Sequence, residues 1–492
     1  MPLMTSLPTT FLQGPPSPLV VTCPRPSAGP FDLYANIASP RCPSFLFESG
    51  GGMTGMERYS FFGSDPYQLL CGTPDRYLRR SVEGREESGP APFHYLTKLM
   101  GTSSIARPRD VPPFFGGAIG YFSYDLARRF ERLPSLTLDD LATPDFEFAF
   151  FDLVAAIDHK LNVLVLMFCP PPERFLSETR EKLYREGCDR LTALHAQLLS
   201  SPVTAATDTT TIRLTFSPDQ DRSSYIDRVR RCQDYIAAGD IYQANVSHRF
   251  TVTGDILSPQ PDLQSDLLAY GRMRALNPAP FSGLLRLDRV SLISSSPERL
   301  VRLNGHQADT RPIAGTRPRG GNTTDDQRLA DELRSNEKER AEHVMLVDLE
   351  RNDLGRVCES GSVRVDELMA LEHYSHVHHL VSHVTGTLRS DATGFDLLKA
   401  VFPGGTITGV PKIRCMEIIE ELEPVRRGTY TGSMGYLSWS GDLDFNIVIR
   451  TLVRTNGKAY LQVGAGIVAD SDPAREYEET IHKAQAFLHA FA

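Results

Sequence analysis

The stretch PGGTITGVPKIR, residues 403–414, guides our interpretation of the fold. It is rich in glycine and hydroxyl residues and runs into CMEIIEEL, residues 415–422, where apolar side chains recur at helical spacing. We therefore predict a flexible loop that feeds a helix at 411–422, with Pro411 in its first turn. Backbone N–H groups at the start of this helix, together with the Thr406 and Thr408 hydroxyls, would bind an anion. The alternative interpretation is a loop-to-helix junction without a ligand. The pattern argues against a P-loop, because Lys412 follows Pro411 and is not followed by Ser or Thr.

The composition limits the classes of function. A length of 492 residues predicts two or three domains, and a net charge of −9 with interspersed signs argues against nucleic acid and membrane surfaces as partners. The eight cysteines include no C-x-x-C pair, and the first 24 residues contain no Lys or Arg, unlike a secretory signal. We expect reduced thiols and a cytoplasmic location.

The first part of the chain is mostly β in its pattern. Residues 1–30, rich in Pro, Ser and Thr, predict a poorly ordered leader. The segment SPVTAATDTTT, 201–211, has the composition of a linker after an N-terminal region at 31–200. In that region we expect strands at 44–49, 58–63, 113–122, 146–157 and 161–168 and a helix at 172–199.

The second part, 212–492, is expected to be the catalytic domain. A helix from about Tyr225 ends at Gly239, and an alternating strand follows at 240–247. Further strands are expected at 281–287, 290–294, 377–384, 443–453 and 459–463, and helices at 325–346, 411–422 and 475–491. This irregular interleaving favours an α+β fold over a doubly wound parallel sheet.

Glutamates on two of the predicted helices are candidate metal ligands. Glu476, Glu479 and Lys483 project from one face of the last helix, which follows the glycine-rich VGAGIVAD, 463–470. A salt-bridged solvent face is one interpretation. The other is a Mg²⁺ ion that the carboxylates hold beside a substrate carboxylate. Glu339 and Glu342 also share a helix face, and a solvated face is again the alternative.

Arg450 lies in the apolar stretch NIVIRT, 446–451. A charge buried in such a strand needs an anionic partner, either a structural carboxylate or a substrate carboxylate bound by two hydrogen bonds. The residue types alone therefore indicate an enzyme that acts on a small carboxylate with magnesium.

Six motifs carry a resemblance to a known family. In order they are RPIAGTRPRG (311–320), VDLERNDLG (347–355), HLVS (379–382), FPGGTITG (402–409), GAGIVADS (464–471) and EYEET (476–480). With these motifs, the chain from about residue 44 to its end resembles the chorismate-utilising enzymes. The resemblance implies two facing, largely antiparallel β-sheets with helices outside, and a magnesium-dependent chorismate site in the C-terminal part.

The resemblance also implies roles for single residues. Glu342 and Glu479 match the magnesium ligands, with Glu339 and Glu476 close by. Glu298 matches the general acid at the 4-hydroxyl of chorismate, and His379 lies near the same leaving group. The positions that bind the substrate are Gly315, Thr316, Thr406, Tyr430, Arg450, Gly464, Ala465, Gly466 and Lys483.

The branch of the family follows from fewer residues. Gln243 stands where water-adding members carry a lysine base, so amination is favoured over hydration. The stretch GGTITG, 404–409, resembles aminodeoxychorismate synthases, large component, whereas Ala314 is typical of anthranilate synthases. The resemblance implies formation of 4-amino-4-deoxychorismate. Anthranilate formation and a non-catalytic regulatory subunit are the alternatives.

The partners follow from what the motifs lack. No cysteine stands in a glutaminase's nucleophile motif, so ammonia is expected from a separate glutamine amidotransferase subunit or from solution. Residues 44–49 and 58–63 resemble the region that binds tryptophan in anthranilate synthases, although Phe47 stands where leucine is usual.

Overall fold

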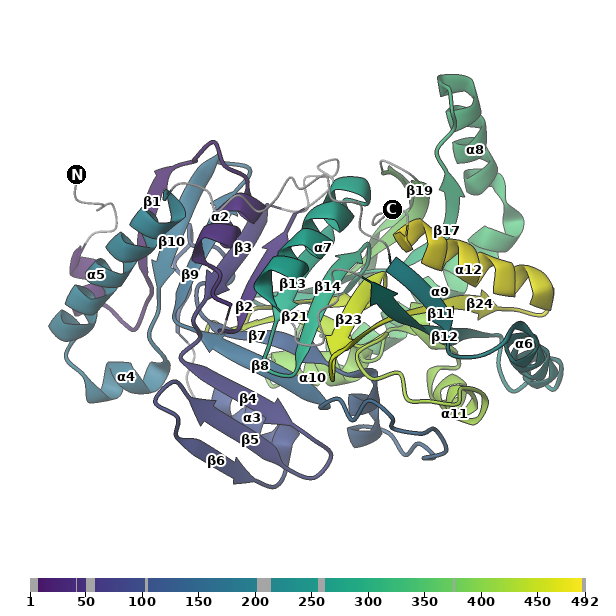
Figure 1. Cartoon of the computed structure of the whole chain (residues 1–492), viewed down its shortest axis with the longest axis horizontal. Helices are drawn as coiled ribbons and strands as arrows, with labels where there is room; N and C mark the ends of the chain where they lie inside the picture. The colour runs from purple at the N-terminus through teal and green to yellow at the C-terminus, as the bar shows by residue number, and fades with distance from the viewer. Residues whose placement is uncertain are drawn as a thin grey trace.

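The computed structural model describes residues 8–40, 42–49, 58–101, 105–200, 214–254, 262–374 and 377–488. Within these residues two sheets of 12 strands each are built from antiparallel pairs, and helices cover their outer sides (Figure 1). The predicted α+β fold with two facing antiparallel sheets is confirmed.

The elements are as follows. The first sheet runs in the order β1 (Leu19–Pro24), β10 (Val163–Phe168), β9 (Leu153–Asp158), β3 (Tyr59–Ser64), β2 (Ser44–Glu48), β13 (Phe281–Arg286), β14 (Val290–Ser296), β23 (Thr451–Thr455), β24 (Lys458–Ile467), β12 (Gln243–Gly254) and β11 (Leu214–Pro218), and β20 (Gly409–Val410) pairs with β12. The second sheet runs in the order β17 (Ile313–Pro318), β19 (Val377–Thr387), β16 (Gln307–Arg311), β15 (Arg299–Asn304), β22 (Leu443–Ile447), β21 (Ser433–Ser438), β7 (Gly117–Phe122), β8 (Phe146–Phe151), β4 (Gln68–Gly72), β5 (Tyr77–Ser81) and β6 (Glu86–Gly89), and β18 (Arg364–His373) pairs with β19. The helices are α1 (Pro8–Gln13), α2 (Pro30–Ile37), α3 (Pro92–Gly101), α4 (Pro172–Ser177), α5 (Arg180–Leu198), α6 (Arg222–Ala237), α7 (Leu263–Leu276), α8 (Thr323–Ser335), α9 (Glu337–Gly355), α10 (Gly394–Val401), α11 (Lys412–Leu422) and α12 (Pro473–Leu488), with 3-10 turns η1 (Tyr124–Arg129) and η2 (Gly405–Ile407).

Both sheets combine strands from the two halves of the chain. In the first sheet β2 pairs with β13, and in the second β7 pairs with β21. Figure 1 shows the purple and blue strands continuing into teal and yellow ones. The regions 31–200 and 212–492 are therefore divisions of the sequence that share both sheets. The predicted linker at 201–211 lies outside the described residues.

The prediction of a poorly ordered leader is wrong for residues 8–24. These residues form α1 and β1, and β1 is the edge strand of the first sheet, where Leu19 pairs with Phe168 of β10. Leu19, Val21 and Cys23 alternate into the core and are buried. Burial of this apolar face and pairing with a strand some 140 residues away outweigh the Pro- and Ser-rich composition.

Aromatic side chains fill the space between the sheets. Phe45 of β2 and Phe61 of β3 each lie 6.0 Å from Phe114 between ring centroids, and Phe61 lies 5.9 Å from Tyr436 of β21. These rings meet edge to face, the arrangement that aromatic quadrupoles favour. The core therefore joins the two sheets directly.

Four predicted elements are interrupted in the structure. The strand expected at 146–157 divides into β8 and β9, which belong to different sheets, and the helix expected at 172–199 divides into α4 and α5. The helix expected at 325–346 is split into α8 and α9 at Asn336, whose side chain accepts a hydrogen bond from the Glu339 amide (3.0 Å) and caps α9. The strand expected at 443–453 is split into β22 and β23 by Arg450, which has a positive φ of 49°. The helix predicted at 411–422 is confirmed as α11, with Pro411 as its N-cap.

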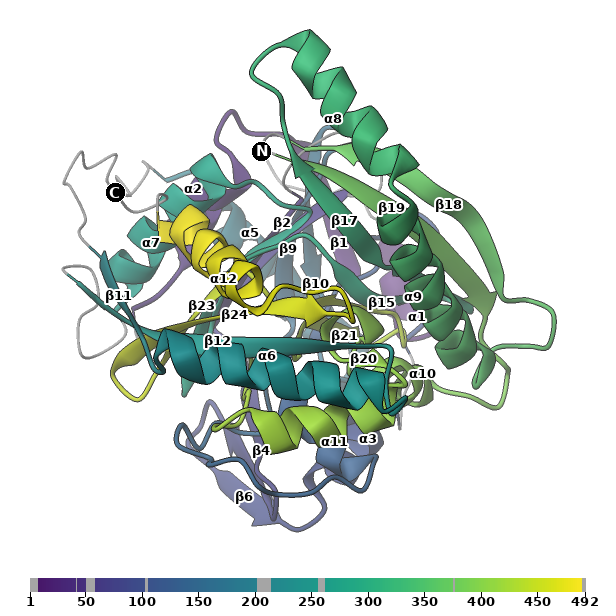
Figure 2. The same cartoon turned by 90° about the vertical axis from the view of Figure 1, so that its right-hand side faces the viewer.

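A second apolar cluster fixes the orientation of β12 and β24. Their outward side chains, among them Val246 and Ala465, pack with α6 and α11, and Tyr477 of α12 joins this cluster. Figure 2 shows these three helices lying over the two strands. Because strand side chains alternate, Gln243 and Asn245 point to the opposite, inner face. The inner face carries the site described below.

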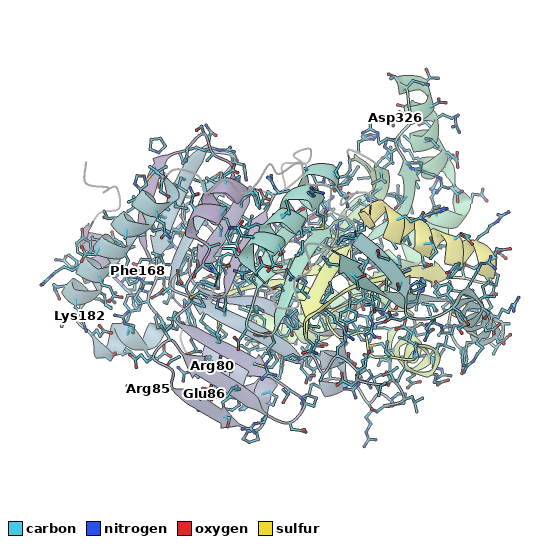
Figure 3. The ribbon with its side chains drawn as sticks, viewed as in Figure 1. Arg80, Arg85, Glu86, Phe168, Lys182 and Asp326 are labelled. Carbon is cyan, nitrogen blue, oxygen red and sulfur yellow. The ribbon has the colours of Figure 1, made fainter. Side chains whose placement is uncertain are left out.

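Two of the charged pairs lie at the periphery. Arg80 and Glu86 form an exposed ion pair of 2.9 Å on the β5–β6 hairpin (Figure 3). Asp326 of α8 accepts hydrogen bonds from Arg319 (2.7 Å) and lies 2.9 Å from His378, which ties α8 to β19. None of the described helices is long and apolar enough to cross a lipid bilayer.

Candidate active site

Glu298 is a buried carboxyl between the ends of β14 and β15. Its Oε1 accepts a hydrogen bond from the Ile313 amide (3.3 Å), and its carbonyl accepts one from the Ile447 amide (3.0 Å). Burial raises the pKa of Glu298 to about 8, although the nearby Thr406 hydroxyl and the Ile313 amide act in the opposite direction. Glu298 is therefore protonated at neutral pH and able to donate a proton.

Arg450 lies where β22 gives way to β23. Its carbonyl accepts a hydrogen bond from the Ser295 amide (3.1 Å), which anchors the backbone at the strand break. Within the described residues its guanidinium makes no hydrogen bond or ion pair. Burial lowers its pKa, and the neighbouring Glu298 opposes this effect. A half-buried guanidinium in this state is prepared for an anion from outside the chain.

His379 of β19 faces β17, where it is paired with Thr316. The Thr316 hydroxyl lies 2.9 Å from His379 Nδ1, and the Tyr374 ring packs against the imidazole at 5.5 Å. Burial, with Arg450 as a further cause, lowers the pKa of His379 to about 3. The imidazole is therefore neutral. The structure thus brings the predicted Glu298, Arg450, Thr316 and His379 into one neighbourhood.

The loop that opened the sequence analysis closes this neighbourhood. Thr406 Oγ1 is buried without a hydrogen-bond partner in the described residues, beside the Glu298 carboxyl. Thr408 differs, since its hydroxyl donates to the Gly404 carbonyl (2.8 Å). Lys412 also turns away and pairs with Asp353 of α9 at 2.5 Å. Of the two predicted hydroxyl donors, only Thr406 is available to a ligand.

Strands β12 and β24 form a wall of this site. Two glycines of β24 leave space, because a Cβ at Gly464 would lie 2.9 Å from the Tyr430 hydroxyl, and one at Gly466 would lie 2.6 Å from Gln243 Nε2. Lys483 of α12 donates to the Gly464 carbonyl (3.0 Å). Ala465 departs from the predicted set, because its side chain packs into the outer cluster and leaves only backbone on this wall.

The glutamates predicted to bind magnesium come from α9 and α12. Glu339 pairs with Arg317 (3.0 Å), and Glu479 pairs with Lys483 (2.7 Å). Glu339 also borders β17, since a Cβ at Gly315 would lie 2.9 Å from its Oε2. In the part of the chain that the structure describes, no three His, Cys, Asp or Glu side chains are close enough to share a metal ion. The carboxylate oxygens of the predicted glutamates suit Mg²⁺. Glu339 and Glu479 would have to give up their ion pairs with Arg317 and Lys483 to bind it, so the metal site stays a prediction.

One residue pair that supports the site was missed from the sequence. Arg427 donates to Glu423 (2.7 Å), to the Asn245 carbonyl of β12 (2.7 Å) and to the Ile407 carbonyl of the loop (2.9 Å). Glu423 also accepts hydrogen bonds from the amide and hydroxyl of Ser247 (2.9 and 2.8 Å). The pair fixes β12 and the loop relative to each other. The i, i+4 spacing of Glu423 and Arg427 is the only signal of it in the sequence.

The sequence of the chain matches the profile of the chorismate binding enzyme family over residues 57–489. The chain belongs to the chorismate binding enzymes. Family members are similar over nearly the full length. Anthranilate synthase component 1 of Thermus thermophilus is 48% identical over 467 residues, covering 94% of this chain and 95% of the relative. Aminodeoxychorismate synthase component 1 of Bacillus subtilis is 42% identical over 464 residues and covers 93% of each chain.

A solved structure of the family has the same fold. The crystal structure of anthranilate synthase component I from Streptococcus pneumoniae superposes with a TM-score of 0.75 at 33% identity, covering 89% of this chain and 93% of that one. The two-sheet arrangement that positions Glu298 and Arg450 is thus shared within the chorismate binding enzymes.

A separate cavity of about 310 Å³ lies between the sheets. Its lining includes Ser49, Tyr59, Arg109, Phe281 and Met434, and neither Glu298 nor His379. It coincides with the two segments whose sequence resembles the tryptophan-binding region of anthranilate synthases, although residues 50–57 between them lie outside the described part.

Proposed function

We propose that this chain aminates chorismate with ammonia to give 4-amino-4-deoxychorismate. The observation that carries the proposal is a protonated buried carboxyl, Glu298, beside a half-buried cation without a partner in the described residues, Arg450. An acid next to an anion receptor suits a substrate that carries carboxylates and loses a hydroxyl group. Gln243, an amide, lines the same wall and cannot take a proton from water, which favours a nitrogen nucleophile.

The roles of the residues follow from their protonation states. Arg450 binds one carboxylate of chorismate, and the Thr406 hydroxyl donates a hydrogen bond in the same pocket. Glu298 gives its proton to the 4-hydroxyl, which leaves as water while a C–N bond forms. Neutral His379, held by Thr316, adjoins the leaving group without adding positive charge. The net change replaces a hydroxyl with an amine.

The ammonia is proposed to come from a glutamine amidotransferase subunit or from solution. None of the eight cysteines, all of which are described, is exposed or forms a disulfide. Burial raises the pKa of the Cys71 and Cys232 thiols to about 12, which opposes formation of a nucleophilic thiolate. These thiols are therefore poor candidates for glutamine hydrolysis within this chain.

Magnesium is part of the proposal, with Glu339 and Glu342 of α9 and Glu476 and Glu479 of α12 as its ligands. When bound, the ion neutralises the ring carboxylate while negative charge builds up on the departing oxygen. We expect Glu342→Ala to abolish magnesium binding by calorimetry in the presence of chorismate and to abolish turnover. Near-normal turnover of this variant would show that the metal assignment is wrong.

Anthranilate synthesis is the second candidate. Ala314 of β17 supports it, because many aminodeoxychorismate synthases would carry a nucleophilic lysine there, and the name of the Thermus relative supports it as well. The loop sequence GGTITG, 404–409, and the name of the Bacillus relative support the first candidate.

Product identification decides between the candidates. The purified chain is incubated with chorismate, Mg²⁺ and ammonium at mildly alkaline pH. The products are then separated by chromatography and identified by mass spectrometry. We expect 4-amino-4-deoxychorismate, which yields 4-aminobenzoate when a lyase is added. Fluorescent anthranilate with pyruvate would establish the second candidate. No magnesium-dependent consumption of chorismate would indicate a non-catalytic subunit.

A further inference from the structure

Two amide oxygens on the site wall lack hydrogen-bond partners. Gln243 Oε1 and Asn245 Oδ1 are both buried, and the described residues offer neither of them a donor. The two residues are separated by one position in β12, so their side chains leave the strand on the same inner face. Buried acceptors without donors are rare in folded proteins, and each calls for an explanation.

Glycines of the facing strand accommodate both amides. Gly464 and Gly466 of β24 lie opposite, and a Cβ at Gly464 would come within 2.4 Å of Asn245 Oδ1. At Gly466 a Cβ would come within 2.6 Å of Gln243 Nε2. Any larger residue on β24 would therefore displace the amides, so the two glycines allow both amide side chains to pack against this strand.

The backbone behind Asn245 is held in place. Its carbonyl accepts from Arg427 (2.7 Å), and its amide donates to the Thr408 carbonyl (2.9 Å). The next inward residue, Ser247, is bound by Glu423 through both its amide and its hydroxyl. The two amide acceptors are thus mounted on a strand fixed from both sides, which a subsite for a small ligand requires.

We propose that Gln243 Oε1 and Asn245 Oδ1 form the subsite that binds the attacking ammonia. This inference rests on the proposed amination of chorismate. Ammonia has three N–H donors and one lone pair, so it fills two acceptors and keeps its lone pair for the ring. Ammonium has no lone pair, and the positive charge of Lys483, which donates to the Gly464 carbonyl, opposes its binding.

The subsite also accounts for the preference for ammonia over water. Water bound to the same two oxygens needs a base to become a strong nucleophile, and an amide has no basicity at neutral pH. Neutral ammonia attacks without prior loss of a proton. The C–N bond forms as the C–O bond breaks, and Glu298 protonates the leaving hydroxyl to give water. The new C–NH₃⁺ group then releases one proton, which restores the charge balance.

Steady-state kinetics with ammonia as the nitrogen source test the subsite. Asn245→Leu and Gln243→Met replace each amide with an apolar side chain of similar size. We expect each variant to raise KM for ammonia about five- to tenfold, as loss of one hydrogen bond predicts, while KM for chorismate changes less than about twofold. Gln264→Leu, an exposed glutamine on α7, is the control and should leave both constants unchanged.

The outcomes separate the subsite from the proposed function. If the wild type forms no aminated product at any ammonium concentration, both fail. If the wild type aminates chorismate but both variants keep its KM for ammonia, the subsite alone is overturned. A parallel rise of both KM values would also overturn it, because that pattern indicates a disturbed chorismate pocket. Calorimetric binding of chorismate to each variant verifies that the pocket is folded.

Discussion

Two arginines in the C-terminal half, the buried Arg427 and the half-buried Arg450, have opposite surroundings. In the turn from Glu423 to Thr431, Arg427 donates to a carboxylate and to two backbone carbonyls, and its guanidinium packs over the Tyr124 ring at 4.9 Å. In the strand break from Ile447 to Thr451, Arg450 has no such partner among the described residues. Burial alone lowers the pKa of an arginine. The Glu423 carboxylate reverses that effect at Arg427, whereas Arg450 keeps a lowered pKa.

The difference separates architecture from function. A buried charge that is fully paired joins segments of the fold, and its removal leaves the partner uncompensated. A buried charge without a partner weakens the isolated protein and is retained only where something else binds it. Arg427 therefore holds the site together, whereas Arg450 is the proposed receptor for the substrate anion.

The largest effect is expected from replacing Arg427, the arginine with a carboxylate partner. Arg427→Met leaves Glu423 buried without its cation and should lower the free energy of unfolding by about 3–5 kcal/mol. Urea unfolding monitored by circular dichroism measures it. The neighbouring Arg426, which pairs with Asp139 at 3.2 Å near the surface, is the matched control, and Arg426→Met should cost about 1 kcal/mol or less. Equal effects of the two substitutions would contradict the role assigned to Arg427.

Replacement of Arg450, the arginine without a partner in the described residues, should affect substrate binding rather than stability. Arg450→Met should leave the free energy of unfolding unchanged or raise it, because a desolvated charge is removed. Chorismate binding should weaken about 10- to 100-fold, since a hydrogen bond to a charged group contributes about 1.5–3 kcal/mol. Calorimetric titration with chorismate and urea unfolding of the same sample measure both. A loss of stability like that of Arg427→Met would erase the distinction.

Glu298, the acid beside Arg450, should make kcat depend on pH. Because the pKa of Glu298 is raised to about 8, the proton donor is present below that pH and is lost above it. We expect kcat to fall about tenfold per pH unit above 8, with the concentration of unprotonated ammonia held constant. Glu298→Gln should be nearly inactive, and its residual kcat should not fall between pH 8 and 9. A flat wild-type profile up to pH 9 would refute the assignment.

A buried carboxyl in the N-terminal half, Glu147, should give the smallest effect. Glu147 of β8 accepts from the amides of Asp288 (3.0 Å) and Arg289 (3.2 Å), and burial raises its pKa to about 8. The folded state keeps this proton while the unfolded state releases it above pH 4.5, so stability falls as pH rises toward 8. Between pH 7 and 8 the wild type should lose about 1 kcal/mol that Glu147→Gln does not lose. Parallel pH profiles in urea unfolding would contradict this.

Local patterns predicted most single elements of the fold. Helix α6 and its end at Gly239, the strands β13 and β14, and helix α11 follow from periodicity and terminating residues. The failures arise where long-range contacts override local signals. Strand β1 is hidden in a proline-rich stretch until β10 pairs with it, and the break at Arg450 requires a positive φ that an apolar strand pattern does not show.

The sequence proposed residues for the site, whereas their protonation states required the structure. Motif resemblance identified Glu298, His379 and Arg450, but their pKa values depend on burial by strands far apart in the sequence. Asn245 and Arg427 were missed because their roles arise only when β12, the loop and the Glu423 turn meet. The sequence analysis predicted that the Thr408 hydroxyl would bind the ligand. In the structure this hydroxyl donates instead to the Gly404 carbonyl.

The sharing of both sheets between the halves has a consequence for synthesis. Strand β7 is flanked by β8 and by β21, which leaves the ribosome about 300 residues after β7. At roughly 5–20 residues per second, that neighbour arrives on the order of 15 to 60 s later. During this interval the edge of β7 and its aromatic face stay uncovered. The growing chain is therefore exposed to aggregation for most of its synthesis, and a chaperone that shields the first half should raise the yield of active protein.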